Sequence, residues 1–291
     1  MESIAVVCNP IAGNGLSLTA SAAVQTSLKG RDIPFTYLQS EHPRHATELA
    51  KQAALSGAAT CIAIGGDGTL LEVAQGLYGT ETALGIIPAG TGNDFIKTIG
   101  TPKETEKALD AILTLPPRKT DIVTLNDRVF LNETGTGFDV MVLDYAEKAK
   151  KYVKGLLPYL YGVLKTIFHY SGIHLTYQAD DGKPVEKDIL VLGAGNGRFI
   201  GGGIPIAPEA IPDDGLLDLV IVEEMRKLRM LSVLPGLMQG KILSFKETTF
   251  TRIRSLLIEG KGLRINIDGE IIPLDRAEIT VRPGALLVHR P

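Results

Sequence analysis

The first 125 residues alternate short β-branched apolar runs with stretches whose apolar residues recur at helical spacing. The expected strands are Ile4–Cys8, Phe35–Gln39, Thr60–Ile64, Leu84–Ile87 and Thr120–Leu125. The expected helices between them are Ser17–Lys29, Ala46–Ser56, Leu70–Leu77 and Thr105–Leu113. This alternation predicts a doubly wound parallel α/β sheet, which binds ligands beyond the carboxyl ends of its strands.

After about residue 126 the pattern changes to short strands separated by Gly, Asp and Pro turns. The expected strands are Val129–Asn132, Ile173–Gln178, Ile189–Gly193, Leu216–Val222, Thr248–Ile258, Leu263–Ile267 and Glu278–Val281. Two helical stretches interrupt them, Val142–His169 and Arg226–Gln239. We therefore predict an α/β domain over residues 1–125 and a mainly antiparallel β domain over residues 126–291. The last few residues remain free to pack back onto the first domain.

Composition excludes several classes of protein. The net charge is −3, from 30 Lys and Arg against 33 Asp and Glu, so no global basic field is available for nucleic acid. Cys8 and Cys61 lie inside apolar runs, as buried thiols of a reducing compartment do. The sequence shows no signal peptide and no transmembrane segment, so we expect a cytoplasmic protein without a nucleic-acid partner.

Three glycine-containing loops follow strands of the first domain, over Asn9–Gly15, Gly65–Thr69 and Pro88–Phe95. Glycine lets the backbone approach a ligand and present its N–H groups, and a helix N-terminus adds a partial positive charge. Asp67 lies among them, and a carboxylate beside phosphates needs a cation such as Mg²⁺ between them. The loops predict a site for a nucleoside triphosphate with Mg²⁺. The competing interpretation is that the glycines only serve tight turns, and three loops at one sheet edge favour the phosphate site.

The paired motifs Gly65-Gly66-Asp67-Gly68-Thr69 and Gly90-Thr91-Gly92-Asn93-Asp94-Phe95 resemble the diacylglycerol kinase catalytic-domain family, in its soluble bacterial lipid-kinase branch. The early Asn9-Pro10 and the late Asp268-Gly269-Glu270 are similar to the first and last motifs of that family. The resemblance covers essentially the whole chain. It implies an active site in a cleft between an α/β domain and a C-terminal β-sandwich domain.

The resemblance also implies roles for single residues. Asp67 would hold the catalytic Mg²⁺, directly or through water, and Asp94 and Asp121 would join the hydrogen-bonded network around it. Glu270, in a turn between two strand-like runs, would be the general base. The nucleotide-binding residues would be Asn9, Ser40, Gly65, Gly66, Asp67, Gly68, Thr69, Glu72, Gly90, Thr91, Asn93 and Asp94.

A second, structural Mg²⁺ site is implied at Asp213-Asp214-Gly215-Leu216. The side chain of Asp214 would coordinate the ion beside backbone oxygens of Ile211 and Leu216. The alternative is a turn in which the aspartate bonds its own backbone and needs no metal.

The function that this resemblance implies is an ATP- and Mg²⁺-dependent lipid kinase, which makes phosphatidic acid if its acceptor is diacylglycerol. The sequence leaves the acceptor lipid open. One alternative is an NAD kinase-like nucleotide kinase, and another is a nucleotide-sensing protein without turnover. The sensor is favoured by the lack of a lysine after the first glycine loop, where many relatives carry one. In a kinase, Arg44, Lys154 or Lys165 would have to balance the charge of the transferred phosphate in place of that lysine.

The stretch Ala146–Ser171 begins with lysines and then becomes apolar, as in a helix that lies on an anionic membrane surface. A core helix with a solvated first turn is the commoner explanation of such a pattern. Arg226, Lys227 and Arg229 form a second, weaker basic patch. Peripheral contact with the inner face of the membrane is compatible with these features, and a homodimer remains open.

Overall fold

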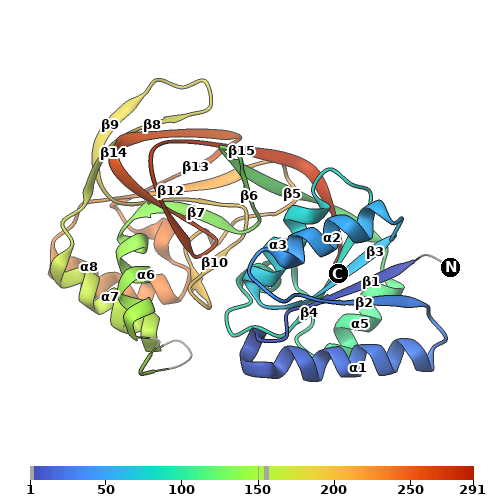
Figure 1. Ribbon diagram of the computed structural model, residues 1–291. Coiled ribbons are helices and arrows are strands. Elements are labelled where there is room, and N and C mark those ends of the chain that lie inside the picture. Colours follow the sequence, from blue (N-terminus) through green and yellow to red (C-terminus); the bar gives the residue numbers. More distant parts are fainter. Residues whose placement is uncertain (1–2, 150, 154–156) are drawn as a thin grey trace. The chain divides into compact units, whose positions relative to one another are not determined.

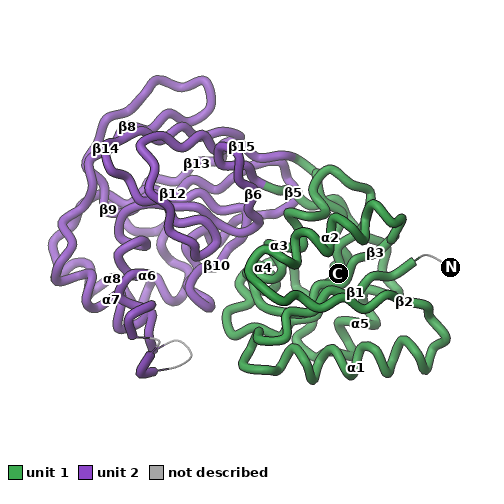
Figure 2. The backbone as a smooth tube through the Cα atoms, in the orientation of Figure 1, with its two compact units in different colours: residues 1–122, 283–291 green, residues 123–282 purple. Residues whose placement is uncertain are grey.

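The structure, a computed structural model, describes residues 3–149, 151–153 and 157–291 in two compact units (Figure 2). Unit 1 holds the chain up to Ile122 together with Pro283–Pro291, and unit 2 holds Val123–Arg282. The chain passes from one unit to the other within two strands, β5 and β15. Their bounds are Pro117–Leu125 and Glu270–His289.

Unit 1 contains a parallel sheet in the strand order β2-β1-β3-β4, and the end of β15 pairs with β4 in parallel through Val288 and Leu84. The bounds are β1 Ile4–Cys8, β2 Phe35–Gln39, β3 Thr60–Gly65 and β4 Ala83–Pro88. The residues of β1 and β3 are all buried, which explains their nearly continuous apolar sequence. Cys8 and Cys61 are both buried and form no disulfide.

Helices cover both faces of this sheet (Figure 1). Their bounds are α1 Leu16–Gly30, α2 His45–Leu55, α3 Asp67–Leu77, α4 Asp94–Ile99 and α5 Thr105–Thr114, with a short 3₁₀ turn at Ala12–Gly15. The helices α1 and α5 pack together with one face of the strands, and α2 and α3 pack together on the other. The predicted doubly wound α/β domain is confirmed.

Two helix positions in unit 1 differ from the sequence prediction. Helix α3 begins at Asp67, where Leu70 was expected, because Gly66 is extended and Asp67 places its charge in the first helical turn. Helix α4 was not expected, since its length of 6 residues is too short for a periodic pattern. It lies between Asn93 and Gly100, which both adopt the left-handed conformation.

Unit 2 is built on an antiparallel sheet in the order β13-β12-β9-β7-β14-β15, in which β8 also pairs with β9 and β14. The main strands are β6 Arg128–Phe130, β7 Glu133–Gly137, β8 Ile173–Ala179, β9 Val185–Gly195, β12 Leu217–Glu223, β13 Thr248–Ile253 and β14 Ser255–Ile267. A separate short pair is β10 Phe199–Ile200 with β11 Ile204–Pro205. The predicted mainly antiparallel domain is confirmed.

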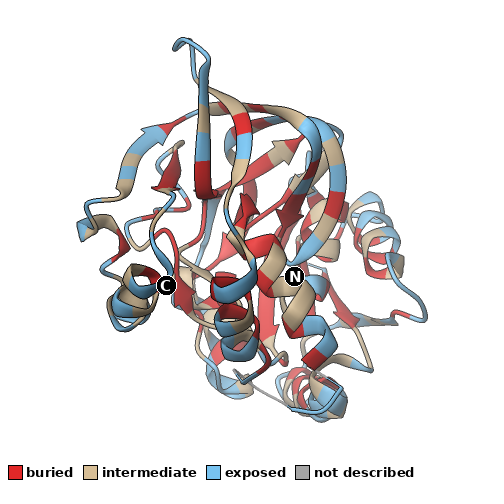
Figure 3. Cartoon of the chain, turned by 90° about the vertical axis from the view of Figure 1, so that its left-hand side faces the viewer, coloured by how far each residue is buried: buried red, intermediate tan, exposed pale blue. Residues whose placement is uncertain are grey.

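Three helices of unit 2 pack against the strands β9 and β12 in a second apolar core. They are α6 Phe138–Ala149, α7 Leu157–His169 and α8 Lys227–Met238, followed by a 3₁₀ turn at Ile242–Ser244. Buried residues follow the strands and the inner helix faces (Figure 3). No helix among the described residues is long and apolar enough to cross a membrane.

Several predicted elements of unit 2 need correction. The single strand expected over Thr248–Ile258 is two strands, β13 and β14, which break at Arg254. The expected strand Glu278–Val281 is a short part of β15, and the expected helix Val142–His169 is the pair α6 and α7. The strand β7 was missed because its glycines resemble a turn. A Cβ atom at Gly135 would lie 2.8 Å from the carbonyl oxygen of Leu192, so the close strand pairing requires glycine there.

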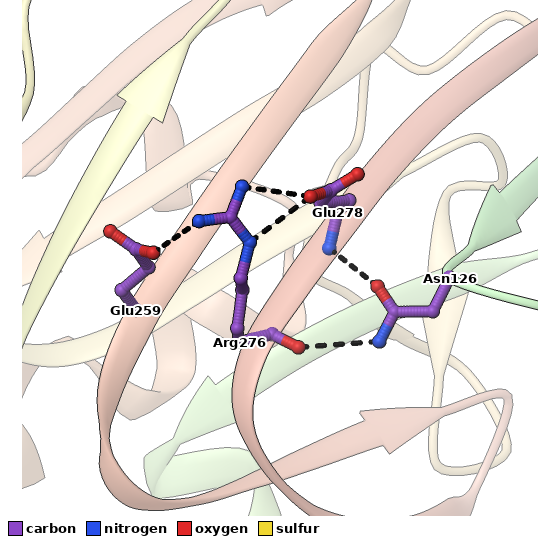
Figure 4. Close-up of polar contacts among 4 residues, drawn as sticks. All are labelled: Asn126, Glu259, Arg276 and Glu278. Atoms are coloured by element: carbon purple, nitrogen blue, oxygen red, sulfur yellow. Dashed lines mark hydrogen bonds and ion pairs between the residues drawn. The ribbon is translucent and has the colours of Figure 1, made fainter.

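Asn126 fastens the turn between β5 and β6 to the long strand β15 (Figure 4). Its side-chain amide donates to the carbonyl oxygen of Arg276 at 3.2 Å and accepts from the N–H of Glu278 at 2.9 Å. Asn126 has a φ of 49°, in the left-handed region. Arg276 in turn joins Glu259 and Glu278 by ion pairs. The turn therefore depends on both the conformation and the amide of this asparagine.

We expect Asn126→Ala to lower the free energy of unfolding by about 2 kcal/mol and Asn126→Gly by about 1 kcal/mol. Both variants lose the amide hydrogen bonds, but only alanine is strained at a positive φ. Urea denaturation of both variants measures the difference. Equal losses would show that the backbone conformation carries no cost at this turn.

Candidate active site

Three loops of unit 1 meet at the carboxyl edge of its sheet, with their backbones in contact. A Cβ atom added to Gly90 would lie 2.4 Å from the Cα of Gly66, so the loops after β3 and β4 touch. A Cβ atom at Gly13, whose φ is +59°, would lie 2.0 Å from the carbonyl oxygen of Ala89. These glycines are therefore required by the approach of the loops to one another.

Side-chain hydrogen bonds also hold these loops in place. The amide of Asn9 donates to the hydroxyl of the buried Thr69 at 3.1 Å, which joins the loop after β1 to the start of α3. Asn93, with a φ of 54°, donates to the carbonyl oxygen of Gly90 at 2.8 Å. Gly68 and Thr91 are exposed, and a Cβ atom at Gly68 would meet nothing within 4 Å. The loops thus present an open face beside Gly68.

Asp67 lies at the centre of the loops and holds two of them together. Its Oδ1 accepts the backbone N–H of Asp94 at 2.8 Å, which ties the start of α3 to the start of α4. Burial, and then the nearby charge of Asp94, raises the pKa of the Asp67 carboxyl. Lys97 forms an ion pair with the Asp94 carboxylate at 3.0 Å. Two carboxylates in one partly buried site favour a bound cation.

Ser40 and Glu72 hold the neighbouring loop after β2. The buried Ser40 donates its hydroxyl to the carbonyl oxygen of Cys8 at 3.5 Å. The Glu72 carboxylate accepts the N–H groups of Arg44 and Ala46, at 3.0 and 3.2 Å. Glu72 therefore positions the start of α2, and Ser40 ties the chain after β2 to the end of β1.

Asp121, in the middle of β5 and in unit 1, is 1% exposed. Its Oδ1 accepts the N–H of Gly284 at 2.7 Å. This bond joins β5 to the part of β15 that returns to unit 1. Asp121 therefore anchors the C-terminal segment of the chain.

Glu270 lies in unit 2 as the first residue of β15, directly after the turn Asp268–Gly269. Both turn residues have positive φ angles, 46° and 94°, as a two-residue hairpin turn requires. The side chain of Glu270 is 60% exposed and forms an ion pair with Arg128 at 3.0 Å. Its carboxylate is therefore accessible at a fixed turn.

The side chains of Asp268 and Asn266 hold this turn by hydrogen bonds to the backbone. The Asp268 carboxylate accepts the backbone N–H groups of Leu131, Asn132 and Glu133, at 2.9, 3.0 and 2.8 Å. The side-chain oxygen of Asn266 accepts the N–H of Gly269 at 2.9 Å. The position of the Glu270 backbone is thus set by hydrogen bonds from both sides of the turn.

Asn266 also links this turn to a buried pair of acids, Glu133 and Asp139. The amide nitrogen of Asn266 donates to both carboxylates at 3.2 Å. Burial raises the pKa of Asp139 to about 6, and burial with the charge of Asp139 raises the pKa of Glu133 well above its usual range. The pair therefore retains protons at pH values where free carboxyl groups are ionised.

The loop expected to hold a structural metal forms a turn of its own. The Asp214 side chain accepts the N–H of Leu216 at 2.9 Å, and Ile211 is 39% exposed. Asp218 is buried beside Arg252, and its Oδ2 has no hydrogen-bond partner within the described part of the chain. Over residues 3–149, 151–153 and 157–291, no three His, Cys, Asp or Glu side chains are grouped as metal ligands.

Comparison with known proteins gives the family. Residues 3–125 match the diacylglycerol kinase catalytic domain, and residues 132–290 match the YegS C-terminal NAD kinase beta sandwich-like domain. A Pseudomonas putida protein named "Probable lipid kinase YegS-like" is 36% identical over 251 residues, which cover 84% of this chain and 82% of that protein. The chain belongs to the diacylglycerol kinase catalytic-domain family.

Another relative and two solved structures are also similar to this chain. A diacylglycerol kinase from Mycobacterium tuberculosis is 29% identical over 294 residues, which cover 99% of this chain and 95% of the relative. The crystal structure of a diacylglycerol kinase from Bacillus anthracis has a TM-score of 0.72 at 22% identity and covers 100% of this chain and 97% of its own. Yeast NADH kinase complexed with NADH has a TM-score of 0.54 at 8% identity, covering 99% and 82%. These two structures show a shared fold.

Lys97 also lies at this site, and it was not among the residues predicted from the sequence. The signal was its spacing of three residues from Asp94, which brings the two side chains together on a helix. Of the basic residues considered instead, Arg44 lies at the start of α2 and Lys165 lies on α7 in unit 2. Lys154 lies outside the described residues.

Gly90 and Gly68 differ in the space that is available for a side chain, so alanine should have different effects at the two positions. We expect Gly90→Ala to destabilise the protein by about 2 kcal/mol, because the new methyl group meets the Gly66 backbone. Gly68→Ala has room and should leave stability nearly unchanged. If the loops bind ATP as the sequence predicts, this variant should weaken ATP binding about tenfold by filling the open face. Thermal unfolding and calorimetric titration with ATP measure the two effects. Unchanged ATP affinity in Gly68→Ala would place the nucleotide elsewhere.

The buried acids predict a pH dependence of stability. Because the folded state keeps protons that the unfolded state releases, the free energy of unfolding falls as pH rises from about 4 through about 6. Glu133→Gln removes one of these titrating groups, so its unfolding free energy should fall less over this range than that of the wild type. Urea denaturation at several pH values tests this, with the exposed Glu224→Gln as control. Parallel profiles for Glu133→Gln and wild type would contradict it.

Proposed function

We propose that this protein transfers the γ-phosphoryl group of ATP, with Mg²⁺, to the hydroxyl of diacylglycerol or a related lipid. With diacylglycerol the product is phosphatidic acid. The observation that carries the proposal is the meeting of three glycine loops around Asp67, in a chain of the diacylglycerol kinase catalytic-domain family. ATP, the usual donor of a kinase, is abundant in the cytoplasm, where we place the protein.

The glycine loops of unit 1 are assigned to the phosphates of ATP. Backbone N–H groups at the start of α3, and the exposed Gly68 and Thr91, suit an anionic ligand. Asp67 would hold Mg²⁺, directly or through water, with Asp94 in the network around the ion. Burial and the nearby charge of Asp94 raise the pKa of Asp67, which supports a cation at this position. Bound Mg²⁺ neutralises charge on the phosphate oxygens. Lys97 supplies a further positive charge, which fills the role of the lysine absent after the first glycine loop.

Glu270 is assigned as the general base. Phosphoryl transfer needs one carboxylate to accept the proton of the attacking lipid hydroxyl. The Glu270 carboxylate is exposed at a turn that Asp268 and Asn266 fix, and the ion pair with Arg128 orients it. The Glu270 carboxylate would therefore accept the proton from a fixed, solvent-accessible position.

The second metal remains part of the proposal. Asp214 with backbone oxygens of Ile211 and Leu216 would hold a structural Mg²⁺. The unpartnered oxygen of Asp218, and burial that raises the Asp218 pKa to about 6, favour a cation in this region of unit 2. The turn formed by Asp214 and the N–H of Leu216 leaves the second carboxylate oxygen of Asp214 available.

Glu270→Gln tests the assignment of the base. We expect it to lower turnover about a hundredfold to ten-thousandfold with little change in stability, because the glutamine keeps the side-chain shape but cannot accept the proton. Transfer from labelled ATP to lipids in mixed micelles measures the effect. Glu81→Gln, at an exposed position in the turn between α3 and β4 of unit 1, is the control.

Two outcomes would contradict the proposal. Full activity of Glu270→Gln would remove Glu270 from the mechanism. Tight ATP binding by the wild type, without labelled product from any lipid or from NAD, would favour a nucleotide sensor.

A further inference from the structure

Helix α7 of unit 2 exposes an apolar stripe to solvent. Its members recur three or four residues apart and are between 40% and 59% exposed: Leu157, Leu160, Tyr161, Leu164 and Phe168. The other side of the helix, with Gly162, Val163 and Ile167, is buried. A surface helix normally places polar residues on its outer face. The exposed apolar face of α7 therefore indicates an interaction surface.

The start of α8 extends this surface. The Lys227 ammonium donates to the carbonyl oxygen of Phe168 at 2.7 Å, which brings the two helix ends together. The next residue, Leu228, is 82% exposed. We call the five residues of the stripe together with Leu228 the α7 patch.

Basic residues surround the α7 patch. Lys165 lies beside the stripe on α7, which contains no Asp or Glu. Exposed basic residues lie at the end of α6 and the start of α8, namely Lys148, Lys151, Arg226 and Lys227. The exposed acids in the same segments are Glu147 and Glu224. The described charges around the patch are thus mostly positive.

We propose that the α7 patch docks on an anionic lipid bilayer. An apolar helix face with basic flanks buries its side chains among acyl chains while its lysines meet anionic headgroups. The positive flanks argue against a second copy of this chain, because two such surfaces would repel each other. The biological purpose, access to a lipid acceptor, rests on the proposed function, but the binding itself does not.

Vesicle co-sedimentation without ATP tests the docking. Vesicles of phosphatidylcholine alone are compared with vesicles that also contain phosphatidylglycerol. We expect the wild type to prefer the anionic vesicles and Leu160→Gln/Leu164→Gln to bind them about tenfold more weakly. The control is Leu55→Gln/Val185→Gln, which changes two exposed apolar residues outside the patch and should bind as the wild type does.

A charge series tests the basic flanks separately. Lys148→Glu/Lys151→Glu should weaken binding to anionic vesicles severalfold, and added salt should reduce the difference. Lys183→Glu is the control, because Lys183 is exposed in the turn between β8 and β9, at the other end of unit 2 (Figure 1). Loss of binding in this control equal to that of the double variant would overturn the localisation to the α7 patch.

Three other results would also overturn the proposal. They are failure of the wild type to bind anionic vesicles, unchanged binding by Leu160→Gln/Leu164→Gln, and a patch-dependent dimer that binds no vesicles. If Leu160→Gln/Leu164→Gln unfolds, Leu157→Gln/Phe168→Gln on the same stripe replaces it. Activity on a short-chain diacylglycerol in detergent micelles separates the two proposals. Vesicle binding without any such activity refutes the kinase reaction and leaves the docking surface in place.

Discussion

The contact between the backbones of Gly66 and Gly90 is the constraint on which the candidate site depends. It brings together the loops after β3 and β4, and Gly13 adds the loop after β1 by its approach to Ala89. Only residues without a Cβ permit these distances. Once the backbones touch, Asp67 accepts the N–H of Asp94, and this bond joins the start of α3 to the start of α4. The glycines are therefore required by the architecture of the loops, and the phosphate site that we propose there depends on it.

Four of the acids described above, Asp67, Glu72, Asp121 and Asp268, are also structural anchors. Asp67 holds α4, Glu72 holds the start of α2, and Asp121 holds the C-terminal segment. In unit 2, Asp268 holds the turn that carries Glu270. Removal of any anchor would disturb geometry as well as chemistry. Glu270, which is exposed and makes an ion pair with Arg128, is the acid whose chemistry can be tested with least damage to the fold.

Local patterns were enough to predict much of unit 1. Strands β1 and β2 were predicted at their observed bounds. The continuous apolar sequence of the buried β1, and the short run of aromatic and β-branched residues in the half-buried β2, are direct strand signals. The strand β7 and the acid pair Glu133 and Asp139 could not be found in this way. Their partners lie far along the chain, as in the bonds to Asn266, 133 and 127 residues away. Periodicity carries no information on such contacts. The roles assigned to Asp67, Glu270 and the metal-binding residues remain predictions.

The central claim is that the loops around Asp67 deliver phosphate from ATP to a lipid hydroxyl. The most direct measurement is transfer of label from γ-labelled ATP, with Mg²⁺, by the pure protein to diacylglycerol in mixed micelles, with NAD as a competing acceptor. The account predicts labelled phosphatidic acid and unlabelled NAD. Labelled NADP without labelled lipid would contradict it and would assign the same fold to a nucleotide kinase.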